Sequence, residues 1–433
     1  MINTRTVNDY WLPSRKGFIT NYPNFMQWKR LTAMEMENRK PLNLYLHMPY
    51  CIQRCSYCYY KTVNLRGAEK QQRMSRYVDA LCRELALASK VYHLSDRPVI
   101  SVYFGGGTPS LLAPELLIQI NETLRQYYRL ENAEYTIEAE PVTLTEEKAA
   151  VIMSMGATRI SMGIQSFDTE IIKNSHRLDD EKKALRAIGV AKETGAVVNI
   201  DLMSGLAGET PQTWEHSVLR AIQTGVESIT VYKTELYPNT EYYRNIKNST
   251  LELPSDDDEL KYVEHAVNEL EKAEYIPWSF YTFTRHGKHA HVHSPSVFRG
   301  DDIYAFGTSA FGKLGGYLFQ NTNDEDKYVE MITHEELPVQ RGHLLTALDS
   351  MVRDVVLTMK LVRFDLRYFE QKYGVKLEVL CASAIEALCE GGLITHHDNA
   401  LHLTQKGILY GDYAGKCLAR SLISLGKGAP ELE

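Results

Sequence analysis

Regular alternation of strand-like and helix-like segments is the feature of this chain that most constrains its fold. From residue 43 onward, short runs of β-branched and aromatic residues alternate with longer amphipathic stretches. This order predicts parallel strands joined by crossover helices, because neighbouring parallel strands need a long return connection. Six such units favour an α/β fold with a partial, TIM-like (β/α)6 barrel over a flat sheet. The expected strands are 43–48, 99–105, 135–140, 159–165, 197–203 and 228–235.

The stretches between these strands have helical periodicity. The first carries Met74, Tyr77, Val78, Leu81 and Leu85 at an i, i+3, i+4, i+7 spacing, which places them on one face of a helix. The other expected helices lie at about 113–128, 145–155, 180–194, 211–224 and 256–275.

The last 90 or so residues break this alternation. Helical patterns at 344–361, 365–373 and 376–390 precede two apolar runs separated by Asp398 and Asn399, a pair typical of a hairpin turn. Helices followed by a hairpin resemble a winged helix. The segment from Arg341 to the end has eleven Lys and Arg against eleven Asp and Glu, so it lacks the basic footprint of a nucleic-acid binder. We expect it to pack on the barrel or cover a substrate.

Residues 1–40 have no clear period and carry Tyr10, Trp11, Tyr22 and Trp28. We expect an arm that packs these rings on the main domain; a flap that closes over a substrate is the alternative. The predicted organisation is an arm at 1–40, a barrel with its C-terminal extension at 41–335, and a helical, winged-helix-like domain at 336–433.

Composition excludes several classes of protein. A net charge of −7 gives no support for nucleic-acid or anionic-membrane binding. The sequence has no run of 18 apolar residues, and its first residues lack an apolar leader. We therefore expect a cytoplasmic monomer with reduced thiols and no membrane span.

Three cysteines, Cys51, Cys55 and Cys58, follow the first expected strand with the spacing Cys-x3-Cys-x2-Cys. Three thiolates this close can hold three irons of a [4Fe–4S] cluster and leave the fourth iron open to bind S-adenosylmethionine (SAM). A zinc site usually has paired Cys-x2-Cys arms, which no other cysteine here repeats. A disulfide is disfavoured by the odd total of seven cysteines and the absence of a secretory leader.

A glycine-rich segment, Tyr103-Phe-Gly-Gly-Gly-Thr-Pro-Ser110, ends the second expected strand. Three glycines let the backbone turn sharply and approach a ligand closely. The segment matches neither the P-loop nor the dinucleotide-binding fingerprint. We expect its amides to contact the amino group or carboxylate of SAM.

Polar side chains also end the later strands. Glu138 and Glu140 alternate along one strand and so share one side of it, as contacts for a ligand or as partners in a salt bridge. Gln165 ends the next strand. Asp201 interrupts an apolar run, where a carboxylate is costly unless it has a partner. Arg177 could pair with a carboxylate of ligand or protein.

Together these motifs resemble the radical SAM family of oxygen-independent coproporphyrinogen III dehydrogenase. The resemblance runs from about residue 42 to 320, and implies a [4Fe–4S] cluster, two SAM molecules side by side, and an electron donor such as a flavodoxin or ferredoxin. It places Tyr45, Gly106 and Glu138 at the cluster-bound SAM, and Tyr57, Gly107, Thr108, Gln165, Arg177 and Asp201 at the second.

The sequence departs from this family at two places. The dehydrogenase continues Cys-x2-Cys-Gly-Cys, whereas here Tyr59 and Tyr60 follow Cys58. The related haem chaperone carries His-Asn-x-x-Tyr where this chain has His293-Ser-Pro-Ser-Val297.

The class C radical methylases, which resemble the same family, lack the extra cysteine. We therefore expect methyl or methylene transfer, as C-methylation or cyclopropanation of an unsaturated carbon, with His47 and Tyr59 as candidates for the final base. Coproporphyrinogen decarboxylation, anaerobic haem ring opening and non-catalytic haem trafficking are the alternatives.

Four histidines lie between Arg285 and His293. A solvated loop or a contact to an anionic substrate is the favoured interpretation of this segment, and metal or haem contact is the alternative.

Overall fold

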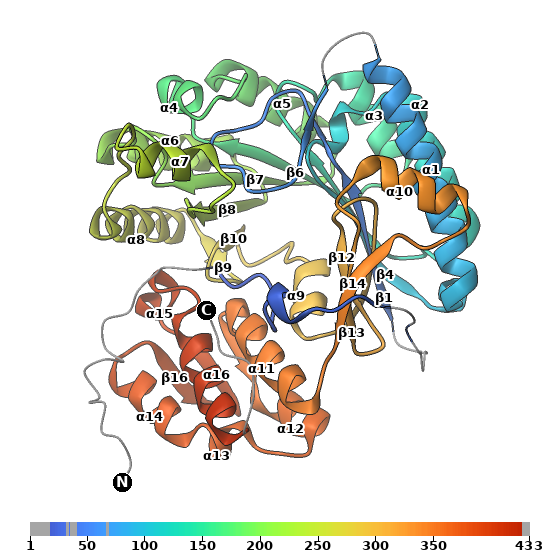
Figure 1. The fold of residues 1–433 in the computed structure, drawn as a ribbon. Coiled ribbons are helices and arrows are strands. Elements are labelled where there is room, and N and C mark those ends of the chain that lie inside the picture. The colour runs from blue at the N-terminus through green and yellow to red at the C-terminus, as the bar shows by residue number, and fades with distance from the viewer. Residues whose placement is uncertain (1–17, 32–33, 35–40, 66–68, 427–433) are drawn as a thin grey trace.

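A computed structural model describes residues 18–31, 34, 41–65 and 69–426. Its centre is a twelve-stranded sheet with the order β14-β13-β12-β11-β1-β4-β5-β6-β7-β8-β10-β9. The strands from β11 to β8 are all parallel, and helices cover their outer side (Figure 1). These strands are β11 (Asp302–Phe306), β1 (Leu42–Met48), β4 (Val99–Gly106), β5 (Glu134–Ala139), β6 (Arg159–Gln165), β7 (Val197–Ser204) and β8 (Ser228–Lys233).

The predicted partial α/β barrel is confirmed, since all six expected strands are present as β1 and β4 to β8. Each expected crossover helix is also present, and short helices α4 (Thr169–Asn174) and α7 (Glu241–Lys247) are additional. The long helices are α1 (Lys70–Tyr92), α2 (Pro114–Tyr127), α3 (Glu146–Ser154), α5 (Glu181–Glu193), α6 (Pro211–Thr224) and α8 (Asp256–Lys272).

Antiparallel strands extend the sheet at both edges, so the barrel stays open. At one edge β10 (Thr282–Arg285) pairs with β8 and β9 (Tyr275–Pro277). At the other edge, three strands follow β11, and helix α10 (Glu325–Thr333) packs on α1. The last of these three strands lies beyond residue 336, so the sheet continues past the predicted start of the C-terminal domain. These strands are β12 (Phe311–Leu314), β13 (Tyr317–Asn321) and β14 (Val339–Leu344).

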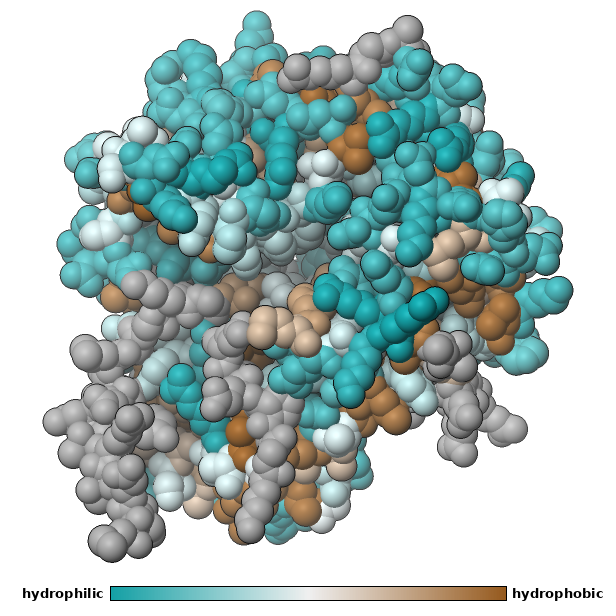
Figure 2. Space-filling view, in the orientation of Figure 1, coloured by the Kyte–Doolittle hydropathy of each residue, from teal (hydrophilic) through white to brown (hydrophobic). Residues whose placement is uncertain are grey.

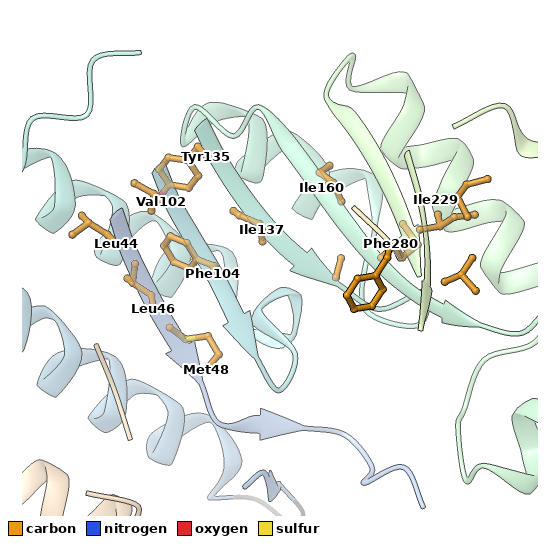
Figure 3. Close-up of a cluster of buried hydrophobic side chains, with 14 of the residues drawn as sticks. Leu44, Leu46, Met48, Val102, Phe104, Tyr135, Ile137, Ile160, Ile229 and Phe280 are labelled. Atoms are coloured by element: carbon orange, nitrogen blue, oxygen red, sulfur yellow. The ribbon is translucent and has the colours of Figure 1, made fainter. Parts of the chain in front are cut away.

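The alternation of side chains along each strand separates the core from the site. Leu44, Leu46 and Met48 of β1 are fully buried on one face of the sheet (Figure 3). Tyr45 and His47 lie between them and point to the opposite, inner face, because successive strand residues alternate. The outer face of the sheet therefore packs against the helices, and the inner face carries the polar groups that point into the barrel.

Helices and a hairpin form the C-terminal part. The turn of the hairpin at Asp398 and Asn399 is present as predicted, with φ values of 51° and 54°. The expected helix at 376–390 is divided at Cys381, whose ψ of 23° is not helical. The elements are α11 (Ala347–Thr358), β15 (Arg363–Asp365), α12 (Leu366–Tyr373), α13 (Leu377–Leu380), α14 (Ala382–Glu390), β16 (Ile394–His397), β17 (Ala400–Leu403), α15 (Gln405–Leu409) and α16 (Tyr413–Leu425).

The arm packs against this framework over its described part. Tyr22 and Trp28 are buried, and Lys29 forms a bridge to Gly342 of β14. Tyr10 and Trp11 lie outside the described residues.

Hydrophilic side chains dominate the face drawn over the barrel helices (Figure 2). Among the described residues, none of the helices is both long enough and apolar enough to span a membrane.

Candidate active site

The cysteine loop begins where β1 ends. Cys51 lies in β2 (Tyr50–Cys51), which pairs with β3 (Val63–Asn64). Further along the loop, the Ser56 amide donates to the Ser175 carbonyl at 3.1 Å, and the Ser56 carbonyl accepts from two amides at the start of α7. The loop is therefore fixed to two other elements before any ligand binds.

Polar groups reach the cysteine sulfurs. The Thr108 hydroxyl donates to Cys51 Sγ at 3.6 Å, and Arg177 Nη1 donates to Cys55 Sγ at 3.8 Å. Burial raises the pKa of Cys51 to about 12 and that of Cys58 to about 11. These thiols would release protons on binding a metal. Soft, desolvated sulfurs with nearby donors fit an iron–sulfur cluster.

The three cysteines are not arranged around a single metal ion. Within the described ranges, no three His, Cys, Asp or Glu side chains are close enough to share one metal ion.

The amides of the glycine-rich segment are already used inside the protein. Gly107 and Thr108 donate to the carbonyls of Met48 and Tyr50 at 2.7 and 2.8 Å. The amide of Gly106 donates to a glutamate of β5 at 3.1 Å. In this structure these amides are bonded to the cysteine loop and to β5, and their contact to SAM stays a prediction.

Close packing explains why these positions are glycines. A Cβ at Gly106, whose φ is +111°, would lie 2.5 Å from the ring of His47. A Cβ at Gly107 would lie 2.6 Å from the carbonyl oxygen of Tyr50. The segment thus lets β4 approach the start of the cysteine loop.

Tyr45 and His47 meet on the inner face of β1, where the Tyr45 hydroxyl lies 3.2 Å from His47 Nδ1. Burial lowers the pKa of His47 to about 4, so its ring is neutral at neutral pH.

Three carboxylates, those of Glu138, Glu140 and Asp201, lie on the same inner side. Glu138 Oε1 accepts from the Tyr103 hydroxyl at 2.7 Å, and Asp201 Oδ1 accepts from Asn199 Nδ2 at 2.8 Å. Burial raises the pKa of Asp201 to about 7. Asp201 therefore has the partner that its apolar sequence context demands.

Arg177 is held on several sides. Its guanidinium donates two hydrogen bonds of 3.1 Å to Asp179 and one of 2.7 Å to the Gly163 carbonyl. It also donates to the Tyr57 hydroxyl at 3.2 Å and lies 3.7 Å from Glu140. Sequence reasoning found Arg177 but missed Asp179, whose position in a loop gives no signal of its own.

Gln165 occupies a strained position. Its φ is +69°, and the pairing of β6 with β7 shifts register there. Its Oε1 is buried without a hydrogen-bond partner among the described residues. A strained residue with an unsatisfied acceptor is a typical feature of a ligand site.

One cavity of about 450 Å³ borders part of these groups. Residues of the arm and C-terminal part line one side of it. The predicted residues that line the other side are Tyr57, Cys58, Tyr59, Gly107, Glu138, Gln165, Arg177 and Asp201, while Tyr45, His47, Cys51, Cys55, Gly106 and Thr108 are not among the lining residues. Beside the cysteines, the charged lining residues are Glu138, Glu140, Asp201 and Arg177. Elsewhere the charged lining residues are Lys233, Glu235, Lys360, Asp412 and Lys416.

The cavity lining therefore has two electrostatic sides. Carboxylates outnumber cations beside the cysteines, which suits the sulfonium and ammonium of SAM. The other side holds three lysines among carboxylates. Lys233 pairs with Glu259 at 3.1 Å and Lys360 with Asp412, so an anionic ligand there would exchange with these carboxylates. This second side was missed from sequence because only the fold brings these lysines to the cavity.

Comparison with known proteins places this geometry in a family. A model described as the radical SAM superfamily matches residues 45–221, and one described as the HemN C-terminal domain matches residues 345–410. The heme chaperone HemW of Mycobacterium tuberculosis (strain ATCC 25618 / H37Rv) is 30% identical over 86% of this chain and 93% of its own. The chain belongs to the HemN-like branch of the radical SAM superfamily.

One further relative agrees with this family, and one solved structure has the same fold. An oxygen-independent coproporphyrinogen III oxidase of Helicobacter pylori (strain ATCC 700392 / 26695) is 26% identical over 90% of each chain. The structure of coproporphyrinogen III oxidase (HemN) from Escherichia coli has a TM-score of 0.81 and 24% identity, and covers 93% of this chain and 96% of its own. Membership of this family implies a [4Fe–4S] cluster and SAM.

The expected methyl or methylene transfer is wrong. The full-length relatives are named for haem chaperoning and coproporphyrinogen oxidation, not for C-methylation or cyclopropanation. The base step for which His47 and Tyr59 are candidates belongs to that rejected reaction, so neither keeps the role.

The histidine-rich segment lies at the opposite strand ends. His291 Nδ1 lies 3.4 Å from Glu134, the first residue of β5, and His293 Nδ1 lies 2.8 Å from Ser101 Oγ near the start of β4. His286 and His289 are exposed. The segment thus covers the N-terminal ends of the strands, away from the cysteine loop.

Proposed function

We propose that this protein is a radical SAM enzyme that oxidatively decarboxylates a propionate side chain of a porphyrin-type tetrapyrrole. The observation that carries the proposal is the two-sided cavity, with carboxylates beside the cysteines and lysines opposite. The relatives named for haem and coproporphyrinogen supply the substrate class.

The reaction balances with one external electron acceptor. A propionate, R–CH2–CH2–COO⁻, becomes a vinyl group, R–CH=CH2, with loss of CO2, one hydrogen atom and one electron. When bound, the cluster and SAM supply the radical chemistry that removes the hydrogen atom. An electron donor such as a flavodoxin or ferredoxin would reduce the cluster, and a one-electron acceptor would take the remaining electron.

Different residues of the chain would bind the cluster and the substrate. Cys51, Cys55 and Cys58 would hold the cluster. Lys233 and Lys416 would bind propionates, because a charge-assisted contact in a confined cavity is stronger than one in water. Lys233 would do so by exchanging its 3.1 Å ion pair with Glu259 for one with the substrate. This arrangement would place the scissile side chain in a site that the arm and the C-terminal part shield from solvent.

A second SAM is part of the proposal. Gln165 Oε1 is a buried acceptor without a partner among the described residues, and Asp201 lines the same cavity, so both could accept from amino or hydroxyl groups of a ligand. Tyr57, Gly107, Thr108 and Arg177 surround the same region and remain proposed contacts, as do Tyr45, Gly106 and Glu138 for the first SAM.

Non-catalytic haem carriage is the second candidate, because the 30% identical relative is a heme chaperone. The position of its haem-ligand signature holds His293 here, whose Nδ1 faces Ser101 inside the protein. This contact favours the enzymatic proposal.

Anaerobic turnover tests the proposal. The protein is loaded with iron and sulfide and given reductant, SAM and coproporphyrinogen III; tetrapyrrole products and 5′-deoxyadenosine are then quantified by mass spectrometry. We expect a product that has lost CO2 and two hydrogen atoms, and none with Cys55→Ala. Porphyrin or haem binding without 5′-deoxyadenosine, or an opened ring, would contradict decarboxylation.

A further inference from the structure

Three tyrosines form a stack beside the last cysteine. The Tyr59 ring lies 4.4 Å from that of Tyr60 and 4.3 Å from that of Tyr237, with interplanar angles of 24° and 35°. Tyr60 and Tyr237 therefore cover the two faces of Tyr59. Tyr60 follows Cys58 by two residues, and Tyr237 lies in the segment after β8.

The end of this stack opens into the cavity. Tyr60 lines the cavity and is 43% exposed, although Tyr59 covers one of its faces. Tyr232 at the end of β8 also lines it and is 37% exposed, with Tyr281 stacked on it at 5.5 Å and 25°. Two tyrosine rings are thus supported from behind and uncovered toward the same space.

Such an arrangement suits a flat aromatic ring of a ligand. Rings held by neighbours lose little freedom when a ligand stacks on them, and offset stacking adds to the burial of apolar area. Isolated exposed tyrosines on a protein surface need no explanation. These two differ because both line the cavity that also holds a cluster cysteine.

We infer that Tyr60 binds a pyrrole ring of the substrate by stacking, with Tyr232 as a second aromatic contact and Tyr59 and Tyr237 as positioning residues behind Tyr60. The inference rests on the proposed tetrapyrrole substrate and names the groups that hold its pyrrole rings. Adenine of SAM is the other flat ring that could stack here, and binding of S-adenosylhomocysteine distinguishes the two.

Matched variants test the stack. Coproporphyrinogen III is titrated anaerobically into the cluster-loaded protein containing SAM but no reductant, and binding is measured by isothermal titration calorimetry. We expect Tyr60→Leu to weaken binding roughly tenfold, which corresponds to the upper range for aromatic pairs, and Tyr60→Phe to change it less than about twofold. Tyr243→Leu is the control, because Tyr243 is 38% exposed on α7 outside the cavity lining.

Two more measurements separate the outcomes. Tyr232→Leu changes β8 and not the cysteine loop itself, and it should weaken coproporphyrinogen binding severalfold even if Tyr60→Leu disturbs the cluster. S-adenosylhomocysteine, titrated in place of SAM, should bind wild type and Tyr60→Leu equally. Equal coproporphyrinogen affinity in wild type and both leucine variants would overturn the inference and leave the proposed function standing. Weaker S-adenosylhomocysteine binding with unchanged coproporphyrinogen binding would assign the stack to adenine and overturn the inference. No coproporphyrinogen binding by wild type would overturn both.

Discussion

Arg177 Nη1 lies 3.8 Å from Cys55 Sγ, so one buried guanidinium joins the cysteine loop to the polar side of the cavity. The same side chain is fixed by two hydrogen bonds to Asp179. A change at Arg177 should therefore affect both the fold and the chemistry.

Arg177→Met should lower the free energy of unfolding by about 3–5 kcal/mol, because it leaves the carboxylate of Asp179 buried without its partner. Anaerobic urea denaturation measures this. Arg220→Met is the control, since Arg220 pairs with Glu181 on the surface and should cost less than about 1 kcal/mol. Equal losses in the two variants would contradict the role given to Arg177.

Gly107→Ala should destabilise the cysteine loop. The added Cβ would lie 2.6 Å from the Tyr50 carbonyl oxygen, so the loop must move, at a cost of about 1–3 kcal/mol and with reduced iron content after reconstitution. Gly189→Ala in α5 is the matched control, because a Cβ there meets nothing within 4 Å. It should stabilise the helix by up to about 1 kcal/mol. Full iron loading of Gly107→Ala would contradict the steric argument.

Glu84 gives the fold a pH dependence outside the site. Its carboxylate accepts from the Tyr328 hydroxyl at 2.6 Å and the Gly307 amide at 2.8 Å, yet burial raises its pKa from 4.5 to about 7. The folded protein therefore binds the proton more tightly than the unfolded chain does. This contribution to stability is complete below pH 4.5 and decreases by about 3 kcal/mol as the pH rises to 7.

Denaturation of wild type and Glu84→Gln at several pH values tests this sign. The difference between the two proteins should change across this pH range, because glutamine does not titrate. Parallel stability curves would show that Glu84 keeps an ordinary pKa.

Lys416→Gln should raise the KM for coproporphyrinogen III roughly tenfold and leave kcat within about twofold, because the proposed contact to a propionate is made equally in the ground and transition states. Steady-state kinetics measures both constants. Lys61→Gln, an exposed residue outside the cavity lining, is the control. A fall in kcat with unchanged KM would contradict a binding role.

The parallel strands and their helices could be predicted because each is long and carries its own periodicity. β9 and β12 could not, since strands of three or four residues are recognisable only by the partners that the fold gives them. The division of the helix at Cys381 likewise depends on tertiary packing.

The site was predictable where chemistry-bearing residues end a strand. Cys51 and Asp201 stand out against apolar runs, and Asp201 has the partner that its context requires. Lys360 and Lys416 gave no such signal, because only the folding of the C-terminal part onto the barrel brings them to the cavity. The reaction was not predictable from the motifs, since relatives that share them differ in what they do.

Transfer of a labelled hydrogen tests the central claim most directly. Coproporphyrinogen III deuterated at the propionate carbon next to the ring is incubated with the reduced, cluster-loaded protein and SAM, and 5′-deoxyadenosine is analysed by mass spectrometry. Decarboxylation to a vinyl group requires removal of hydrogen from that carbon, so we expect one deuterium in 5′-deoxyadenosine together with release of CO2. Unlabelled 5′-deoxyadenosine, or its absence while the porphyrin is bound, would contradict the account.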